Sequence, residues 1–529
     1  MKKISKFILP ENIDGLYKQE ARSSIALARE VAEKINELVT AFNQFSTTDL
    51  AWKHEQEGRI RGGILYMKDN LMDSLQELLK LYDHDAIKGA IKGAMLEAYG
   101  EDLKQMKVIV TPQMFGAIGN GTINDRSAIE KAIASLKEGD ILFFPKGTYL
   151  MTGRAVEIKT ANVTFMGEGL ILCDYGFRVK ASNFKAIGLR MEATKYSTEC
   201  RAFLMENRGL SSGDSDKFIR NFTFKDCYFK NFFYAVNAIG GSYNYGEGEN
   251  DSIYPVRDIV VENCFSETYT DQNAGHFQCI QVENISYINN RTYGGKNASS
   301  YNAIKANGFI RVVGNYDHNN SYASCELENG TCNGVVASNT FKGKIWIDDC
   351  YRIVVNGNTT EDGISVTVGT GANGVDNIAI TNNSCKNVRC EQFGTYKGGV
   401  VGNLIISNNS ISGDNTHGIF VNGNAAKRVK ISGNIISGIN TNDISIQRNE
   451  QIESFIQGNI GNGKNLLIAG SGGKVFAIDN FNFNVSGNRD SLEASHLERS
   501  FTGIKITDSN NVAYRINVNS SGELYASKY

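Results

Sequence analysis

Acidic and aromatic side chains alternate with apolar ones in two short runs of this chain. The run "SCELE" contains Glu326 and Glu328, and the run "KIWID" contains Trp346 and Asp348. If both runs are strands whose Cys, Leu and Ile side chains point inward, these four side chains point outward. Two carboxylates can supply the acid and the base of glycosidic cleavage, and an aromatic face can stack on a pyranose ring. The pattern therefore indicates carbohydrate chemistry, provided that the fold brings the two runs side by side.

An internal repeat predicts such a fold. Short β-like runs, each ending in a two-residue polar or small step, recur from about residue 155 onward. The second residue of the step falls at positions 227, 264, 290, 315, 339, 358, 383, 409, 434 and 459, and seven of the nine spacings lie between 24 and 26 residues. A period near 25 made of strands without intervening helices predicts a solenoid of β-coils, stacked at about 4.8 Å.

The steps are rich in asparagine, which tolerates left-handed backbone and can hydrogen-bond the same asparagine one coil away. Cys227 and Cys264 occupy the same repeat position. The ten cysteines form no CxxC pair. We therefore expect small buried thiols rather than disulfides or a metal site.

Stacking the strands that follow each step predicts two outward columns of side chains. The first column contains Lys305, Glu326, Trp346, Ser365, Glu391 and Phe420, and the second contains Asn307, Glu328, Asp348, Thr367, Phe393 and Asn422. A slip of one residue would reverse every inward and outward assignment.

These columns define the candidate site. We expect Glu326, Glu328 and Asp348 to be catalytic, and the residues that bind substrate to be Trp346, Glu391, Phe420 and Lys305. Glu328 and Asp348 would lie about 5 Å apart, near the spacing of retaining glycosidases, and Glu326 and Asp348 would lie roughly 7–8 Å apart, near that of inverting enzymes. The same face could instead bind glycan without cutting it, or be a solvated polar surface.

Weaker candidates lie elsewhere. Asp271 and His276 could form an acid–base pair, Glu361 and Asp362 fit a turn, and "EGEND" at 247–251 could bind Ca²⁺ but lacks the EF-hand pattern. The sequence contains neither HExxH nor a Cys/His cluster, so we expect no metal and no cofactor. The glycine-rich segment at 116–121 lacks the spacing of a nucleotide loop.

The bulk composition fits a folded protein with a repeat architecture. The chain has 529 residues, 41% hydrophobic content and a formal net charge of −2, which gives no indication of nucleic-acid binding. The N-terminus has too short an apolar run for a signal peptide, and no run is long enough to insert in a membrane, so we expect synthesis in a cytoplasm.

The chain divides into four predicted regions. Residues 1–105 show apolar spacings of 3 and 4, which predict helices that self-associate or dock on another protein, or else form an intramolecular hairpin. Residues 106–154 contain a helix from about Asp125 to Leu136 and the strand "ILFF", and cap the solenoid. Residues 155–475 form the solenoid itself, and 476–529 a C-terminal β tip.

Two segments carry a family resemblance. "FGAIGNGTINDRSAIEKAI" followed by "GDILFFPKGTY" resembles the opening segment of pectate-lyase-like right-handed parallel β-helices, in the variant common in bacteriophage tailspikes and tail appendages. Asn120, Asn124 and Asp125 stand where that family usually has aspartates, a departure that concerns packing and not catalysis. The segment "GIKITDSNNVAYRINVNSSGELYAS" is similar to the β-hairpin tips of phage tail proteins.

The resemblance implies a mainly β protein, a right-handed parallel β-helix (a single-stranded solenoid) with an N-terminal α-helical region, that forms a homotrimer. It implies a virion location as a tail appendage assembled in the host cytoplasm, attached to other tail proteins through the N-terminal helices. It also implies that the β-helix recognises, and cleaves, a host cell-surface polysaccharide. Hydrolysis ranks above lyase chemistry because Lys305 is the one basic residue in the columns. The alternatives are a non-catalytic receptor-binding tail protein and a bacterial polysaccharide-degrading enzyme.

Overall fold

The computed structural model describes most of the chain after residue 108. The described residues are 109–208, 212–241, 253–268, 274–296, 298–318, 322–329, 331–368, 377–392, 401–413, 416–422, 425–447, 453–469, 474–478, 480, 484–487, 505–507, 513–518 and 524–528. The chain divides into two compact units, Met1–Met106 and Lys107–Tyr529. The helical seams predicted for residues 1–105 lie outside the described residues.

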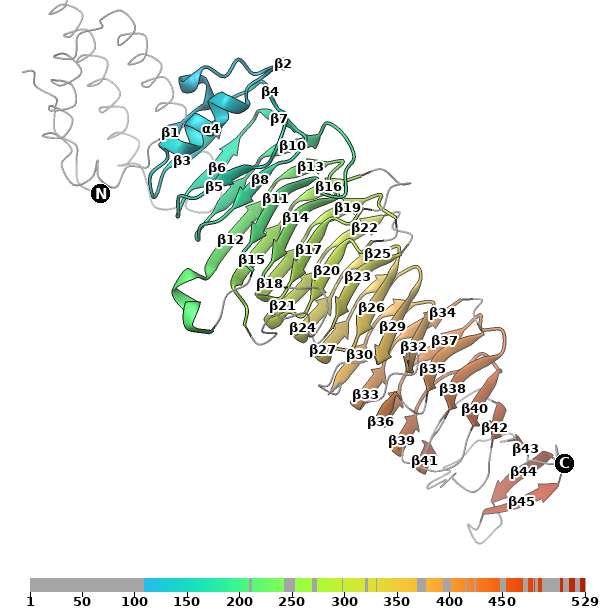
Figure 1. The fold of residues 1–529 in the computed structure, drawn as a ribbon. Coiled ribbons are helices and arrows are strands. Elements are labelled where there is room, and N and C mark those ends of the chain that lie inside the picture. The colour runs from blue at the N-terminus through green and yellow to red at the C-terminus, as the bar shows by residue number, and fades with distance from the viewer. Residues whose placement is uncertain are drawn as a thin grey trace, which may run out of the picture. The chain divides into compact units, whose positions relative to one another are not determined.

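Among the described residues, three parallel sheets, A, B and C, build most of the second unit, and all but the terminal coils contribute one strand to each sheet in turn (Figure 1). Sheet A has 15 strands. In stacking order they are β1 (Ile109–Val110), β3 (Ile141–Phe144), β6 (Thr164–Gly167), β9 (Lys185–Ile187), β12 (Ile219–Lys225), β15 (Val256–Glu262), β18 (Val282–Ile288), β21 (Asn307–Val313), β24 (Cys332–Ala337), β27 (Tyr351–Asn356), β30 (Ile378–Thr381), β33 (Val401–Ser407), β36 (Ala426–Ser432), β39 (Glu453–Gln457) and β41 (Lys474–Ile478).

Sheet B has 13 strands. They are β2 (Asn120–Asn124), β4 (Thr148–Met151), β7 (Leu170–Cys173), β10 (Arg190–Ala193), β13 (Tyr228–Lys230), β16 (Phe265–Glu267), β19 (Arg291–Tyr293), β22 (Tyr316–His318), β25 (Thr340–Phe341), β28 (Thr359–Thr360), β31 (Ser384–Cys385), β34 (Ser410–Ser412) and β37 (Ile435–Ser437).

Sheet C has 14 strands and carries the candidate site. They are β5 (Val156–Ile158), β8 (Phe177–Val179), β11 (Arg201–Glu206), β14 (Tyr234–Ile239), β17 (Phe277–Ile280), β20 (Tyr301–Ile304), β23 (Ala323–Glu328), β26 (Lys344–Asp348), β29 (Gly363–Val368), β32 (Asn387–Gln392), β35 (His417–Asn422), β38 (Asn442–Gln447), β40 (Asn465–Ala469) and β42 (Asn484–Gly487). The predicted parallel β-helix is thereby confirmed. The homotrimer stays a prediction.

A short cap opens the β-helix. The 3-10 helix η2 (Pro112–Phe115) precedes β2, and the helix α4 (Arg126–Ser135) follows it and buries Ile129 and Ile133. The Asp125 carboxylate accepts hydrogen bonds from the backbone N–H groups of Ile118 (2.7 Å) and Gly119 (3.0 Å), so it closes the glycine-rich loop from within. The parallel sheets already begin at Ile109 and continue to Gly487.

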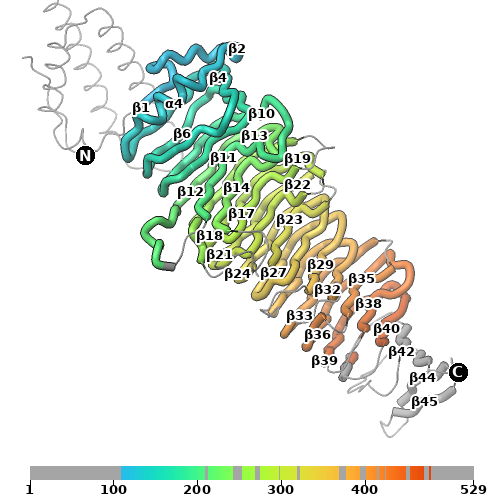
Figure 2. Tube along the Cα trace, viewed as in Figure 1, coloured from blue at the N-terminus to red at the C-terminus, as the bar shows by residue number. Residues whose placement is uncertain are grey.

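The interior changes character along the β-helix. Its first coils are filled by aromatic rings that contact one another in succession, and later coils by Ile and Val. Phe165, for example, packs against Phe144, Phe177 and Phe184 at ring-centroid distances of 5.2–6.3 Å. All ten cysteines are buried and free, as predicted. Figure 2 shows the successive turns of the trace that enclose this interior.

A ladder of buried asparagines fixes the corner between sheets A and B. Its members are Asn290, Asn315, Asn339, Asn358, Asn383, Asn409, Asn434, Asn459 and Asn480. Asn358 is typical: its side-chain amide donates to Val336 O (2.8 Å) and to Asn383 Oδ1 (2.9 Å). Cys264 continues the ladder, since its N–H donates to Asn290 Oδ1 (2.9 Å). Asn290 to Asn459 and Cys264 are predicted step positions, and Asn480 adds one rung that the spacing did not predict.

The last described strands form a separate antiparallel sheet. It contains β43 (Lys505–Thr507), β44 (Ala513–Val518) and β45 (Leu524–Lys528). A second short helix, η3 (Ser212–Lys217), precedes β12. Among the described residues, no helix has the length and apolar character needed to cross a membrane.

Candidate active site

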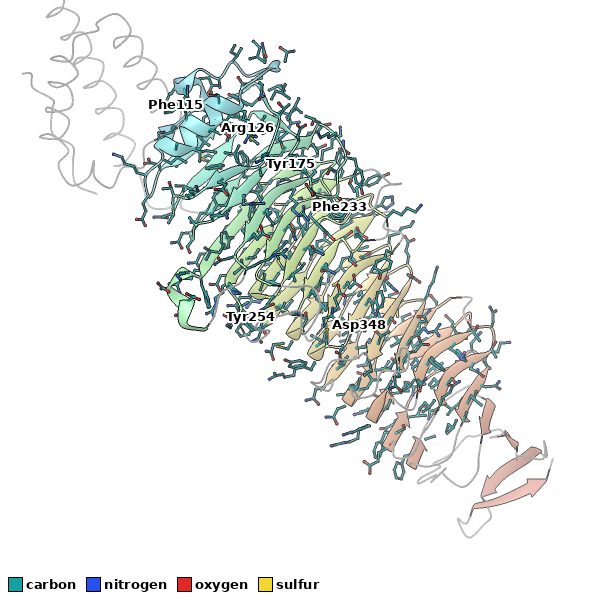
Figure 3. All side chains as sticks on the ribbon, viewed as in Figure 1. Phe115, Arg126, Tyr175, Phe233, Tyr254 and Asp348 are labelled. Atoms are coloured by element: carbon teal, nitrogen blue, oxygen red, sulfur yellow. The ribbon has the colours of Figure 1, made fainter. Side chains whose placement is uncertain are left out.

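The strand register brings the predicted carboxylates together on the outer face of sheet C. On β23 and β26, Glu326 pairs with Trp346 and Glu328 pairs with Asp348. On β29 the two columns continue as Ser365 and Thr367. The outward assignments made from the sequence are therefore correct for the two column positions on each of these three strands. Figure 3 labels Asp348, which lies midway along the stack of coils.

Lys305 does not belong to this face. Strand β20 ends at Ile304, and its register pairs Asn302 with Glu326 and Ile304 with Glu328. Lys305 lies in the following corner with a φ of 50° and is 2% exposed. The prediction was wrong because strand alternation assigns Ile304 to the interior. Ile304 instead joins Ile239 and Ile280 in a small apolar cluster on the outer face.

Glu391 and Phe420 lie further along the same face. On β32, Arg389 pairs with Ser365 and Glu391 with Thr367, so Glu391 is in the second column and not the first. Phe420 pairs with Arg389 and is in the first column as predicted. The guanidinium of Arg389 forms an ion pair with Glu391 and lies 5.5 Å from the Phe420 ring centre. The predicted partner Phe393 lies outside the described residues.

Glu326 and Glu328 converge on one amide that the sequence had not singled out. The Asn302 side-chain nitrogen donates to Glu326 Oε2 (3.1 Å) and to Glu328 Oε1 (3.0 Å). These two carboxylate oxygens therefore lie within about 6 Å of each other, since both are in hydrogen-bonding contact with the same atom. The Ser299 hydroxyl also donates to Glu326 Oε2. Asn302 Oδ1 is buried and has no hydrogen-bond partner among the residues that the structure describes.

Burial makes ionisation of Glu326 unfavourable. Glu326 is 7% and Glu328 5% exposed, and Ile304 flanks Glu328 on the neighbouring strand. Desolvation, and then the charge of Glu328, raises the pKa of Glu326 to about 7, against hydrogen bonds from Ser299 and Asn302 that lower it. Glu326 is thus held protonated close to neutral pH, a property suited to a general acid.

Asp348 is oriented by a hydrogen-bonded chain. Trp346 Nε1–H donates to the Thr367 hydroxyl oxygen (2.7 Å), and that hydroxyl donates to Asp348 Oδ1. Burial raises the pKa of Asp348, whereas the Thr367 hydrogen bond lowers it. Asp348 is more accessible than the two glutamates. Its carboxylate is therefore the member of the cluster best placed to meet water.

A cation covers the tryptophan that was predicted to stack on sugar. Lys344 Nζ lies 3.7 Å from the Trp346 ring centre and 5.3 Å from that of Tyr322, and these two rings are 5.6 Å apart. Desolvation lowers the pKa of Lys344, although the carboxylates of Glu326, Asp362 and Asp348 raise it. Lys344 was missed because it begins its strand, where the alternation gives no signal.

The first column also continues toward the N-terminal coils as a polar track. Arg201 Nε donates to Asn237 Oδ1 (2.7 Å), and Asn237 donates to Gln278 Oε1 (3.1 Å). Gln278 in turn donates to the Tyr234 hydroxyl (2.9 Å). Burial raises the pKa of Tyr234, and Glu326 and Glu328 add to this effect. Polar side chains thus lead along sheet C to the carboxylates.

A buried aspartate braces the strands from behind. Asp317 accepts hydrogen bonds from the hydroxyls of Thr292, Ser300 and Ser324 inside the β-helix. Ser300 precedes β20 and Ser324 lies at the start of β23, while the Gly343 N–H, just before β26, donates to the Ser324 oxygen (2.8 Å). One carboxylate therefore fixes the beginnings of the three strands that carry Asn302, the two glutamates and Asp348.

His276 and Glu361 do not join this cluster. His276 is fully buried and contacts Ser266 Oγ (2.8 Å) and Gly294 O (3.4 Å), and burial lowers its pKa to about 4. Its predicted partner Asp271 and the segment 247–251 lie outside the described residues. Glu361 is exposed and pairs with Lys342 (3.1 Å), as a turn residue would.

Comparisons with known proteins agree with this architecture. Residues 111–296 match the family model described as rhamnogalacturonase A/epimerase, pectate lyase-like. The pre-neck appendage protein of Bacillus phage B103 is 24% identical over 307 residues, which are 53% of this chain and 32% of that protein. The chain therefore spans less than half of the length of this relative.

Two solved structures align with much of this chain at low sequence identity. The N-terminal fragment of gene product 12 of bacteriophage phi29 aligns with 84% of this chain and 76% of its own, at 14% identity and a TM-score of 0.46. The A-module of the mannuronan C-5 epimerase AlgE6 of Azotobacter vinelandii aligns with 70% of this chain and 99% of its own, at 15% identity and a TM-score of 0.40. As the resemblance predicted, the chain is similar to pectate-lyase-like proteins over residues 111–296 and to a phage appendage protein.

Proposed function

We propose that this protein is a phage tail appendage whose β-helix binds a host-surface polysaccharide and hydrolyses it at Glu326, Glu328 and Asp348. One observation carries the proposal: the two glutamates share the Asn302 amide on the outer face, with Asp348 beside them. A solvated polar face would keep three carboxylates apart, because like charges on neighbouring strands destabilise a sheet.

The three carboxylates take different roles in the proposed reaction. Glu326 donates its proton to the glycosidic oxygen as the bond to the anomeric carbon breaks. Asp348 accepts a proton from the water that attacks that carbon. Glu328 shares the Asn302 amide with Glu326, and its charge raises the pKa of that acid. Glu326 and Asp348 are diagonal neighbours, about 7–8 Å apart by register, which predicts inversion at the anomeric carbon.

A binding-only receptor protein is the second candidate function. The observation that favours it is the low exposure of Glu326 and Glu328, at 7% and 5%. A glycosidic oxygen has to reach the acid directly, so a site that keeps this exposure with substrate bound would hold glycan without cutting it.

Virion location, attachment to tail proteins through the N-terminal region and a homotrimeric state complete the proposal. The similarity to an appendage protein of a Bacillus phage supports it. Light scattering on the purified chain tests the trimer, since a mass near that of the 58.1 kDa monomer would contradict it.

Product analysis tests the proposed reaction. The full chain is incubated with purified Bacillus peptidoglycan, wall teichoic acid, a capsular polysaccharide and an O-antigen, and released fragments are identified by mass spectrometry. We expect the wild type to release fragments from one polymer and Asp348→Asn to release none. Binding without release by the wild type would favour the receptor function. Release by Asp348→Asn at the wild-type rate would contradict the site.

A further inference from the structure

A second face of the β-helix carries exposed aromatic rings away from the carboxylates. We define the ring surface as Tyr228, Phe265, Tyr293, Tyr316 and His318, on the outer face of sheet B. Phe265 is 38%, Tyr293 41% and Tyr316 45% exposed. Later strands of the same sheet place Thr340, Thr359, Ser384 and Ser410 in the corresponding outward column. The fold therefore does not require rings at these positions.

The rings form two stacks with ordered neighbours. In one, the Arg190 guanidinium lies 5.8 Å from the Tyr228 ring centre, and Tyr228 lies 5.6 Å from Phe265. In the other, the His318 ring lies 5.2 Å from Tyr293 and 6.2 Å from Tyr316, at interplanar angles of 26° and 9°. These contacts hold the rings in place, so little conformational entropy is lost when a ligand binds.

Charged groups are interleaved with the rings. Arg291 lies between Phe265 and Tyr316 in one column and is exposed. Glu267 lies next to Tyr293 and accepts a hydrogen bond from the Tyr228 hydroxyl. A pyranose presents an apolar face and a rim of hydroxyls, and this surface offers a partner to each. A second protein copy would have to desolvate Arg291 and Glu267, which is unfavourable without matching charges.

The ring surface is continuous in sequence with the carboxylate site. Strand β22 ends at His318, and the same coil continues through Tyr322 into β23, which carries Glu326 and Glu328. Tyr322 contacts Trp346 on the next strand of sheet C. The rings thus occupy the coil of the carboxylates and preceding coils, one corner away.

We propose that the ring surface is a separate glycan-binding site, which retains a long polysaccharide on sheet B. Its ligand is a neutral or mixed-charge chain of pyranose units, bound by ring stacking and by hydrogen bonds to Arg291 and Glu267. The site goes beyond the proposed hydrolysis and does not depend on it, because no ring of this surface belongs to the carboxylate cluster.

The experiment uses the full chain carrying Glu326→Gln, so that polymer is not consumed. Binding to the four polymers named above is measured by affinity electrophoresis, before and after Phe265→Ala, Tyr293→Ala or Tyr316→Ala. Each substitution should weaken binding about three- to tenfold. Phe455→Ala is the matched control, since Phe455 is 48% exposed on sheet A, and it should leave binding unchanged. Circular dichroism and thermal melting verify folding of every variant.

The outcomes separate this proposal from its rivals. Unchanged binding in all three ring variants overturns it, as does a parent protein that binds none of the polymers. A ring variant with unchanged binding and a lower oligomeric mass by light scattering would assign the surface to an interface between copies. If Glu326→Gln still cuts polymer, the proposed hydrolytic site fails. Even in that case, loss of polymer binding in the ring variants would support the glycan-binding site on the ring surface.

Discussion

The asparagine ladder and the carboxylate cluster are both buried polar groups of one β-helix, yet they differ in how completely their hydrogen-bond donors and acceptors are paired. Each internal rung of the ladder has its side-chain donor and acceptor paired, as Asn409 does with Ile380 O, Asn434 Oδ1 and the N–H of Asn383. The cluster brings carboxylates together and leaves Asn302 Oδ1 without a hydrogen-bond partner in the described part of the chain. Complete pairing is what stability alone selects, and the incomplete pairing at the cluster is a departure that the proposed function would explain.

The largest expected effect comes from removing the proposed acid. Glu326→Gln should reduce glycan cleavage about 10³-fold, because general acid catalysis contributes on this scale. The rate is measured as fragment release from the polymer that the wild type cuts. Glu453→Gln, an exposed carboxylate on β39, is the control and should cut at the wild-type rate. A Glu326→Gln variant that retains a tenth of the activity would exclude Glu326 as the acid.

The pH profile is the next largest effect. With the pKa of Glu326 raised to about 7, cleavage should fall about tenfold per pH unit above pH 7 as the acid loses its proton. The measurement is kcat/KM between pH 5 and 9. An alkaline limb that begins near the ordinary carboxyl value, or no such limb, would disagree with the burial of Glu326.

The same shift predicts a stability effect of known sign. A carboxyl whose pKa is raised on folding costs no folding free energy below its unfolded pKa of about 4.5, because it is protonated in both the folded and the unfolded state. It destabilises the fold progressively as the pH rises to about 7. Between pH 5 and 8 the wild type should therefore lose about 1–3 kcal/mol of unfolding free energy relative to Glu326→Gln. The loss is measured as a fall in its melting temperature relative to that of the variant. Parallel curves for the two proteins would contradict this.

Breaking the ladder should affect stability and not cleavage. Asn409→Ala leaves Ile380 O and Asn434 Oδ1 short of a donor and should destabilise the fold by about 2 kcal/mol. Chemical denaturation measures the change, with the exposed neighbour Ser410→Ala as control. Loss of cleavage in folded Asn409→Ala protein would show that ladder and site are coupled, and the contrast between them would not hold.

The smallest effect concerns the orientation of Asp348. Thr367→Val removes the hydroxyl that donates to Asp348 and accepts from Trp346. Cleavage should fall about tenfold, and Thr367→Ser should restore it. Equal rates in the Val and Ser variants would show that the hydroxyl does not position the carboxylate.

The fold could be predicted from the sequence because the repeat places one residue type at one structural position. The spacing of the steps identified the positions later seen as the asparagine ladder, including Cys264. Strand alternation then placed Glu326, Trp346, Glu328 and Asp348 correctly, since Cys325, Leu327, Ile345 and Ile347 are all in the core.

The alternation of inward and outward side chains gave a wrong assignment where an apolar side chain lies on the outer face of sheet C. Ile304 packs on Ile239 and Ile280 on the outer face, so the assignment of Lys305 to that face was wrong and Asn302 was missed. Lys344 and Tyr322 were missed because their contacts with Trp346 depend on strand ends, where neither period nor register is defined by sequence. The depth of burial of the glutamates also depends on neighbours that no local pattern reveals.

The most direct test of the account is the protonation state of Glu326 in the folded protein. Infrared difference spectroscopy, with Glu326→Gln as the subtraction reference, follows the carboxyl band of this residue during a pH titration. The account predicts a midpoint of about 7, with the protonated band present at pH 6. A midpoint near the ordinary glutamate value would show that Glu326 is solvated and ionised, and the carboxylate cluster would then lack its acid.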